Sequence, residues 1–141
     1  RKTDPCWKLK CCVTDRVRKD NNIGHLFKMK NLESNLGYKI CDLWSYLKSN
    51  IQPMFTEKDY LCGTLELDHI IDYHWFLSLN PGDEEFKKCW NMRNLRLITK
   101  KENLKKYRKK IVWEDIKKFD ILDLLPKGAN EIYKTLATLE Q

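Results

Sequence analysis

No long apolar run occurs in this chain of 141 residues, although 42% of its residues are hydrophobic. A membrane-spanning helix needs about 20 consecutive apolar residues, so we expect no membrane span. A secretory signal peptide, internal repeats and low-complexity tracts are also missing. The length fits a single domain with a core of its own, and the composition favours an intracellular protein.

Cysteine pairs with metal-ligand spacing are missing too. The six cysteines include no C-x-x-C pair, which is the spacing that structural zinc sites commonly use. Cys11 and Cys12 are adjacent, a poor geometry for one bridge between them. We therefore expect free, mostly buried thiols in a reducing compartment. A zinc ion held by distant cysteines with His25 or His74 stays open as an alternative without support from the spacing.

Positive charge exceeds negative charge in this chain. The formal net charge is +7, with an isoelectric point near 9.1, and such a balance favours an anionic partner. Seven of the eleven residues from 100 to 110 are basic, and only Glu102 is acidic. A solvated helix face would explain this segment equally well on its own. If a metal site lies beside this segment, contact with nucleic-acid phosphates is the better interpretation.

The stretch from 65 to 110 organises the rest of the chain. Apolar and polar residues alternate at 65–68, as in a half-buried strand, and residues 95–98 form a second short apolar run. Residues 101–110 are rich in Lys and contain no Gly or Pro, which predicts a helix. The order is therefore strand, long loop, strand and helix.

Four polar residues stand out in this stretch. Asp68 and His69 end the first strand, Asn94 opens the second, and Asn103 lies in the basic helix. The predicted order brings Asp68 and Asn103 together, with His69 beside them. A carboxylate and an amide carbonyl are hard oxygen ligands that suit Mg²⁺ or Mn²⁺. A neutral histidine next to such an ion can deprotonate an attacking water molecule, so the set suits metal-assisted phosphodiester hydrolysis.

These residues resemble the HNH nucleases, whose active site is a ββα-metal finger. The order Asp68-His69, Asn94 and Asn103 and the offset of nine residues between the two asparagines match that family, including the HNH domain of CRISPR effector nucleases. The sequence is most similar to phage HNH proteins of the form DHI-x-P-…-F-x-x-x-N-L-…-E-N-L-K-K. The resemblance covers roughly residues 36–110. The family form has Pro and a small residue where this chain has Asp72 and His74.

The resemblance implies an α+β fold, mainly helical, built around a ββα-metal (His-Me finger) motif at 65–110. A helical or extended arm region, 1–64, would precede the motif and a helical tail, 111–141, would follow it within one compact domain. The implied activity is that of a DNA endonuclease or nickase with one Mg²⁺ or Mn²⁺ per site, acting in the cytoplasm or nucleus, or as a viral or phage protein in its host cell.

The resemblance also assigns roles to residues. Asp68 and the Asn103 carbonyl would hold the metal, His69 would take a proton from water, and Asn94 would brace the loop that orients His69. Basic side chains near the site would contact the phosphates of DNA: Arg93, Arg96, Lys101, Lys105, Lys106, Arg108 and Lys110.

Two other classes of function remain open at this level. A nucleic-acid-binding module without catalysis would keep the motif and the basic helix, and a protein-interaction domain would use the C-terminal helices. The chain begins at Arg1 without Met, so we keep open that it belongs to a larger polypeptide; a homodimer is a further alternative.

Outside the motif, the pattern predicts mainly helices. An extended or irregular arm at 1–13 would precede a helix from about 16 to 29, weakened by Gly and Asn, in which His25 is a packing or surface residue. Further helices are expected at 40–47, 83–90 and 112–122, and a last one after Asn130.

Overall fold

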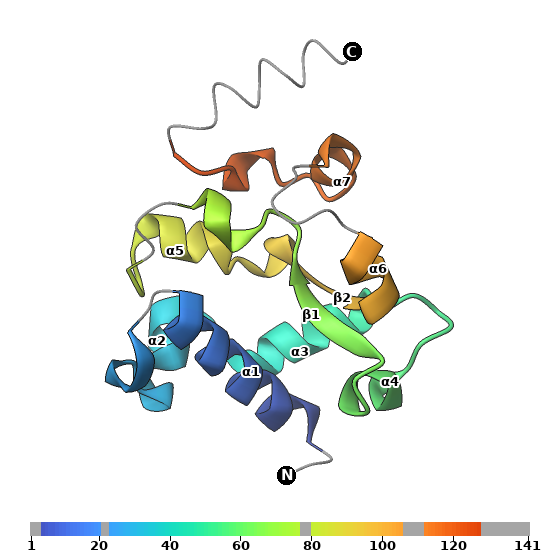
Figure 1. Ribbon diagram of the computed structural model, residues 1–141, viewed down its shortest axis with the longest axis horizontal. Helices are drawn as coiled ribbons and strands as arrows, with labels where there is room; N and C mark the ends of the chain where they lie inside the picture. The colour runs from blue at the N-terminus through green and yellow to red at the C-terminus, as the bar shows by residue number, and fades with distance from the viewer. Residues whose placement is uncertain (1–3, 21–22, 77–79, 106–111, 128–141) are drawn as a thin grey trace.

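The computed structural model describes residues 4–20, 23–76, 80–105 and 112–127. The fold is α+β and mostly helical, with one two-stranded antiparallel sheet (Figure 1). None of the described helices is long and apolar enough to span a bilayer.

Helix α1 begins earlier than the sequence predicts. It runs from Pro5 to Asp20, so the irregular arm predicted over 1–13 is wrong for residues 5–13, while residues 1–3 lie outside the described part. Pro is favoured in the first turn of a helix, where its missing N–H costs nothing, and the Asp4 carboxylate accepts a hydrogen bond from the Cys6 N–H at 3.0 Å. The buried Leu9, Val13 and Val17 recur every four residues, so one face of α1 packs on the core.

The segment after α1 consists of short turns of helix. These are η1 (Gly24–Leu26), η2 (Met29–Asn31) and α2 (Leu32–Leu36), so the predicted helix does not continue to residue 29. Gly37 then takes a φ of 85°, which only glycine adopts at little cost, and ends α2.

Helix α3 (Ile40–Ser49) confirms its predicted amphipathic pattern. Ile40, Leu43, Trp44 and Leu47 are its buried residues, at the spacing of one helical face. A short helix that the pattern did not predict, α4 (Glu57–Leu61), follows and leads into the sheet.

The two predicted strands are confirmed. Strand β1 (Leu65–His69) pairs antiparallel with β2 (Leu95–Thr99), with Asp68 opposite Arg96 and His69 opposite Leu95. The long connection holds η3 (Tyr73–Trp75), α5 (Glu84–Cys89) and η4 (Met92–Asn94), and α5 confirms the helix expected at 83–90. The Asp83 carboxylate accepts from the Phe86 N–H at 2.8 Å and caps α5.

Helix α6 (Lys100–Lys105) follows β2 directly. The remainder of its predicted length lies outside the described residues. Helix α7 (Trp113–Lys118) and η5 (Leu122–Leu124) replace the longer helix expected at 112–122, because the chain turns at Asp120, whose φ is 51°. The helix expected after Asn130 also lies outside the described part.

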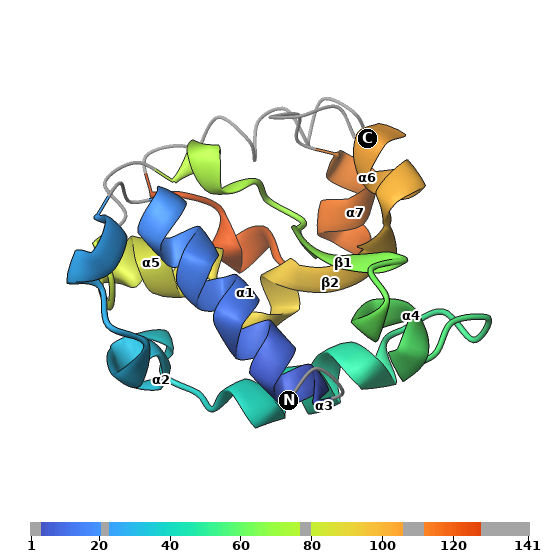
Figure 2. The ribbon, with the colours of Figure 1, turned by 60° about the horizontal axis from the view of Figure 1, so that its bottom comes forward.

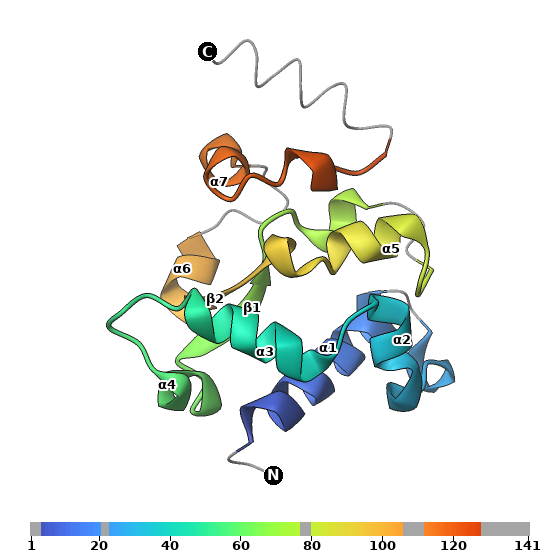
Figure 3. The same ribbon diagram turned by 180° about the vertical axis from the view of Figure 1, so that it is seen from behind.

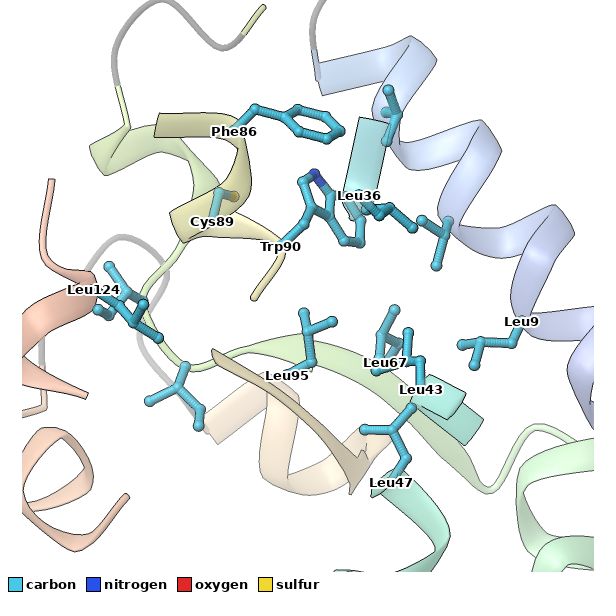
Figure 4. Close-up of a cluster of buried hydrophobic side chains, with 14 of the residues drawn as sticks. Leu9, Leu36, Leu43, Leu47, Leu67, Phe86, Cys89, Trp90, Leu95 and Leu124 are labelled. Atoms are coloured by element: carbon cyan, nitrogen blue, oxygen red, sulfur yellow. The ribbon is translucent and has the colours of Figure 1, made fainter. Parts of the chain in front are cut away.

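The core fills the space between the sheet, α1, α3 and α5. Figure 4 shows Leu43 and Leu47 of α3 near Leu67 of β1, with Phe86 and Trp90 together beside α1. All five are at most 5% exposed, and burying one such side chain contributes about 1.5–3 kcal/mol. The chain after β1 is therefore held to the rest of the domain by its own aromatic residues.

The two faces of the sheet differ: one is apolar and packs on the core, and the other carries carboxylates. Successive side chains of a strand point to opposite faces, so the core face of β1 carries Leu65 and Leu67 while Glu66 and Asp68 point the other way. Helix α3 lies on one side of the strands and α6 on the other (Figures 2 and 3). The predicted ligands of the metal thus project toward the α6 side.

No disulfide forms among the described residues, and all six cysteines are free. Only Cys89 is buried, while Cys41 and Cys62 are exposed. The expectation of mostly buried thiols is therefore wrong, although the expected free state agrees with the structure.

Candidate functional site

A cavity of about 540 Å³ opens at the edge of β1. It lies between β1, the second half of α1, the loop after β1 and helix α6. Asp68 and Asn103, which are distant in the sequence, both line it. The lining residues are Cys12, Arg16, Lys19, Glu66, Leu67, Asp68, Asp72, Tyr73, His74 and Asn103.

Asp68 is 6% exposed and is neutralised from the neighbouring strand. Its Oδ2 accepts a hydrogen bond from Arg96 Nε at 2.9 Å, and Arg96 also contacts Asp115 of α7 at 3.5 Å. A half-buried pair of this kind is costly to break, since the remaining charge loses its partner. Arg96, predicted to contact phosphate, is thus engaged inside the protein.

Asn103 is tied to a carboxylate that the sequence reasoning missed. Its Nδ2 donates to Glu66 Oε1 at 2.5 Å. The amide nitrogen is thereby used, and the carbonyl Oδ1 is the atom left for a ligand. Glu66 precedes Asp68 by two residues on a strand, so period two would have placed both carboxylates on one face.

Asn94 is fully buried and joins three points of the backbone. Its Oδ1 accepts from the Ile71 N–H at 2.8 Å, and its Nδ2 donates to Ile71 O at 3.2 Å and to Cys89 O at 2.8 Å. The backbone carbonyl of Asn94 also accepts from Ile70 N–H at 2.8 Å. Asn94 therefore fixes the start of the loop that leaves β1.

His69 does not line the cavity. Its side chain faces the core, where it is 2% exposed and its ring meets Trp90 edge-on, with centroids 4.4 Å apart and an angle of 77° between the planes. Adjacent residues on a strand point to opposite faces, which separates His69 from Asp68. In this conformation water does not reach the predicted base.

A second histidine does line the cavity. His74, like Asp72, is a position at which the chain departs from the family form, and its Nδ1 lies 3.2 Å from Asp72 Oδ1. The same oxygen accepts from the His74 N–H at 3.1 Å. Asp72 thus begins the 3₁₀ turn η3 and holds the imidazole that follows, within the long loop that the sequence predicts between the strands.

Helix α1 supplies a wall that the motif alone does not predict. Arg16 donates to the backbone carbonyl of Leu67 at 2.9 Å, and Lys19, one turn further along α1, also lines the cavity. Asp20 ends the helix nearby, and burial, together with the charge of Asp72 and against the charges of Arg16 and Lys19, raises its pKa to about 6. The cavity therefore has basic as well as acidic groups on its rim.

The basic residues that the sequence predicts to contact phosphate differ in their surroundings in the structure. Arg93 pairs with Asp123 at 2.6 Å and donates to Asp120 O, and this pairing raises the pKa of Arg93 and lowers that of Asp123. Lys101 is exposed on α6. Lys105 ends α6, with its side chain outside the described atoms, and Lys106, Arg108 and Lys110 lie outside the described residues.

The donor set fits Mg²⁺ or Mn²⁺ better than zinc. Nowhere in the described part of the chain do three His, Cys, Asp or Glu side chains gather closely enough to hold a metal ion. Mg²⁺ keeps several waters and commonly takes one or two carboxylates and the phosphates of its substrate. Asp68 with the carbonyl of Asn103 provides such a partial set.

Comparison with known proteins gives no further guide. No family model, curated protein or solved structure matches this chain.

Proposed function

We propose that the chain is a metal-dependent DNA endonuclease or nickase of the HNH type, in which β1, β2 and α6 form the ββα-metal finger. The observation that carries the proposal is that Asp68 of β1 and Asn103 of α6 line one cavity, and that α6 packs beside β1. The hydrogen bond from Asn103 to Glu66 supports it, since that bond orients the amide with its carbonyl available.

The residues have distinct tasks in this proposal. Asp68 and the Asn103 carbonyl would hold one Mg²⁺ or Mn²⁺, and the ion would stabilise the negative charge that develops during hydrolysis. Asn94 fixes the loop after β1 through its bonds to Ile71 and Cys89. Lys101, exposed on α6, contacts a flanking phosphate of the DNA backbone.

His69 is the base that the sequence predicts, and its place in the core sets a condition on that role. With 2% of its surface exposed against Trp90, the imidazole meets a water molecule only if the indole moves away. The metal ligands and the basic rim do not depend on this movement.

The test is nicking of supercoiled plasmid DNA with Mn²⁺ or Mg²⁺, with EDTA as the blank. Asn103→Ala should remove most of the activity while the unfolding temperature stays within a few degrees of wild type. Asp68→Asn should also remove most of the activity, and it should lower the unfolding temperature because Arg96 loses its charged partner, so it is assayed at a temperature at which it is folded. Asp42→Asn and Asn50→Ala, both exposed and on α3 or at its end, are the matched controls and should nick normally. Nicking that survives EDTA, or that survives both site variants, contradicts the proposal.

A nucleic-acid-binding module without catalysis is the second candidate. The burial of His69 and the partial ligand set favour it. Salt-sensitive DNA binding without any metal-dependent nicking selects this candidate, and absence of both activities leaves a protein-interaction domain.

A further inference from the structure

Arg96 joins the proposed metal ligand Asp68 to helix α7, which lies outside the ββα unit. The register of the sheet places Arg96 directly opposite Asp68, and its Nε donates to Asp68 Oδ2 at 2.9 Å. Its Nη1 donates to Oδ2 of Asp115, in the first turn of α7, at 3.5 Å. Because the N–H groups of a guanidinium point in fixed directions within one plane, a single side chain holds a carboxylate on each side.

The side chains of this chain of contacts are partly enclosed. Those of Asp68, Arg96 and Asp115 are 8%, 20% and 27% exposed. The guanidinium carbon of Arg96 also lies 5.9 Å from the centre of the ring of Phe119, the residue that follows α7. Water screens such charges less than it screens exposed ones, and the guanidinium is restrained from three directions. Arg96 therefore limits where the Asp68 carboxylate can lie.

The balance of charge depends on Asp115. With Asp115 in place, the three groups together carry a net negative charge, and without it the charges of Asp68 and Arg96 would cancel. A site for a divalent cation loses affinity when it loses negative charge. Asp115 also shares the guanidinium, so that the positive charge of Arg96 does not act on Asp68 alone. A carboxylate on α7 thus favours binding of a cation at Asp68.

We propose that Asp115 is a positioning residue for the metal site: through Arg96 it holds the Asp68 carboxylate in place and keeps it available to Mg²⁺ or Mn²⁺. This inference rests on the nuclease function proposed above and deepens it by adding α7 to the site. Asp115 does not line the cavity that Asp68 and Asn103 share, so its effect passes through Arg96. Loss of such an outer partner typically costs about 10–100-fold in metal affinity.

The experiment compares Asp115→Asn with Glu114→Gln, the adjacent position. Both substitutions remove a negative charge from the first turn of α7, so their effects on net charge and on the helix dipole are matched, and Glu114 is exposed. Binding of Mn²⁺ is followed by electron paramagnetic resonance, and nicking of supercoiled plasmid is measured as a function of Mn²⁺ concentration. Unfolding temperatures establish that both variants are folded under the assay conditions.

The two variants should differ in their response to metal. Asp115→Asn should weaken Mn²⁺ binding by about 10–100-fold and raise the Mn²⁺ concentration for half-maximal nicking by a similar factor. Its kcat at saturating Mn²⁺ should stay within a few-fold of wild type, because the ligand itself is still present. Glu114→Gln should match wild type in both measurements.

A second measurement needs neither metal nor DNA. Arg96 keeps one carboxylate when either Asp68 or Asp115 is replaced by Asn, and it loses both in the double variant. In urea titrations with EDTA, the double variant should therefore lose more unfolding free energy than the two single variants lose together. Asp68→Asn combined with Glu114→Gln is the control, and its losses should add.

The outcomes separate this inference from the nuclease proposal. Equal Mn²⁺ affinity in Asp115→Asn and Glu114→Gln overturns the inference alone, as do additive losses for Asp68 and Asp115. A lowered kcat at saturating Mn²⁺ with unchanged affinity also overturns it, because Asp115 would then act on something other than the metal ligand. If the wild-type protein neither binds Mn²⁺ nor nicks DNA, the nuclease proposal fails and this inference falls with it.

Discussion

Asn94 and Ile71 form a reciprocal pair: the side-chain amide of Asn94 accepts from the backbone N–H of Ile71 and donates to its carbonyl. The pair reproduces, with a side chain, the two hydrogen bonds that one strand residue offers another. These bonds extend the contact between β1 and β2 beyond their last paired residues, His69 and Leu95. They lie just before Asp72, the first residue of the loop that lines the cavity.

Replacing Asn94 should therefore cost stability. Asn94→Ala leaves the buried N–H of Ile71 and the Cys89 carbonyl without this partner, and we expect a loss of about 2–5 kcal/mol in the free energy of unfolding. Urea titration followed by tryptophan fluorescence measures it. The exposed Asn50→Ala serves as control and should stay within about 0.5 kcal/mol. An equally small effect of Asn94→Ala would mean that water replaces the amide.

Removing Glu66 should weaken metal binding without removing a predicted ligand. Glu66→Gln loses the charge that holds the Asn103 amide at 2.5 Å, and changes in such outer partners typically cost 10–100-fold in metal affinity. Titration with Mn²⁺ followed by electron paramagnetic resonance gives the affinity directly. Asn103→Ala should weaken it at least as much; an affinity equal to wild type in both variants would place the metal elsewhere.

The basic residues should differ in their effect on DNA binding. Each phosphate neutralised adds roughly 0.9 to the slope of log K against log salt for duplex DNA. Lys101→Gln should flatten the slope by about that amount, whereas Arg93→Gln should leave it unchanged, because Asp123 already neutralises Arg93. The measurement is binding of the protein to several duplexes between low and moderate salt, in EDTA so that no DNA is cut.

The same salt titration tests the basic residues that follow Lys101 in the sequence. Substituting Lys106 together with Lys110 by Gln should flatten the slope by about 1–2 units and weaken unrelated sequences equally. A change in slope with Arg93→Gln, or none with Lys101 and the Lys106–Lys110 pair, would reverse the assignment of the DNA-facing surface.

Asp20 should make stability depend on pH. Burial raises its pKa to about 6 from 3.8, so the folded state binds the proton more tightly than the unfolded chain does. Stability from this group is therefore greatest at low pH and falls as pH rises from about 4 to 6. No described residue hydrogen-bonds its Oδ2.

The check is thermal unfolding of wild type and Asp20→Asn at pH 4.5 and 7.5. Asp20→Asn should raise the unfolding temperature at pH 7.5 more than at pH 4.5, since the cost of a half-buried charge disappears. The exposed Asp15→Asn on the same helix is the control and should change the two values equally. Equal shifts for Asp20→Asn would show that Asp20 is solvated in solution.

The local spacing of apolar and capping residues in the sequence predicts much of this fold. The alternation at 65–68, the spacing of Ile40, Leu43 and Leu47, and the capping Asp83 each predict an element that the structure has. The sequence does not predict the start of α1, because a proline such as Pro5 interrupts a helix in its interior but is compatible with the first turn.

The site is harder to predict because it depends on register and on strand faces. That Asp68 pairs with Arg96 follows from the alignment of β1 with β2, which the sequence does not state. Adjacency in sequence suggested that Asp68 and His69 act together, whereas in a regular strand adjacency separates them. Arg16 is more than fifty residues away from Leu67, and no local pattern links the two.

The bond from Arg16 to the Leu67 carbonyl also bears on how this protein can be divided. A fragment restricted to the two strands and α6 would retain Asp68 and Asn103 but lose the α1 wall of the cavity and the apolar face on which Leu67 rests. Grafting the strand–strand–helix unit onto another scaffold would therefore transfer the ligands without the enclosure. Conversely, exchanging the surface of α1 offers a way to alter what enters the cavity while every residue of the unit stays as it is.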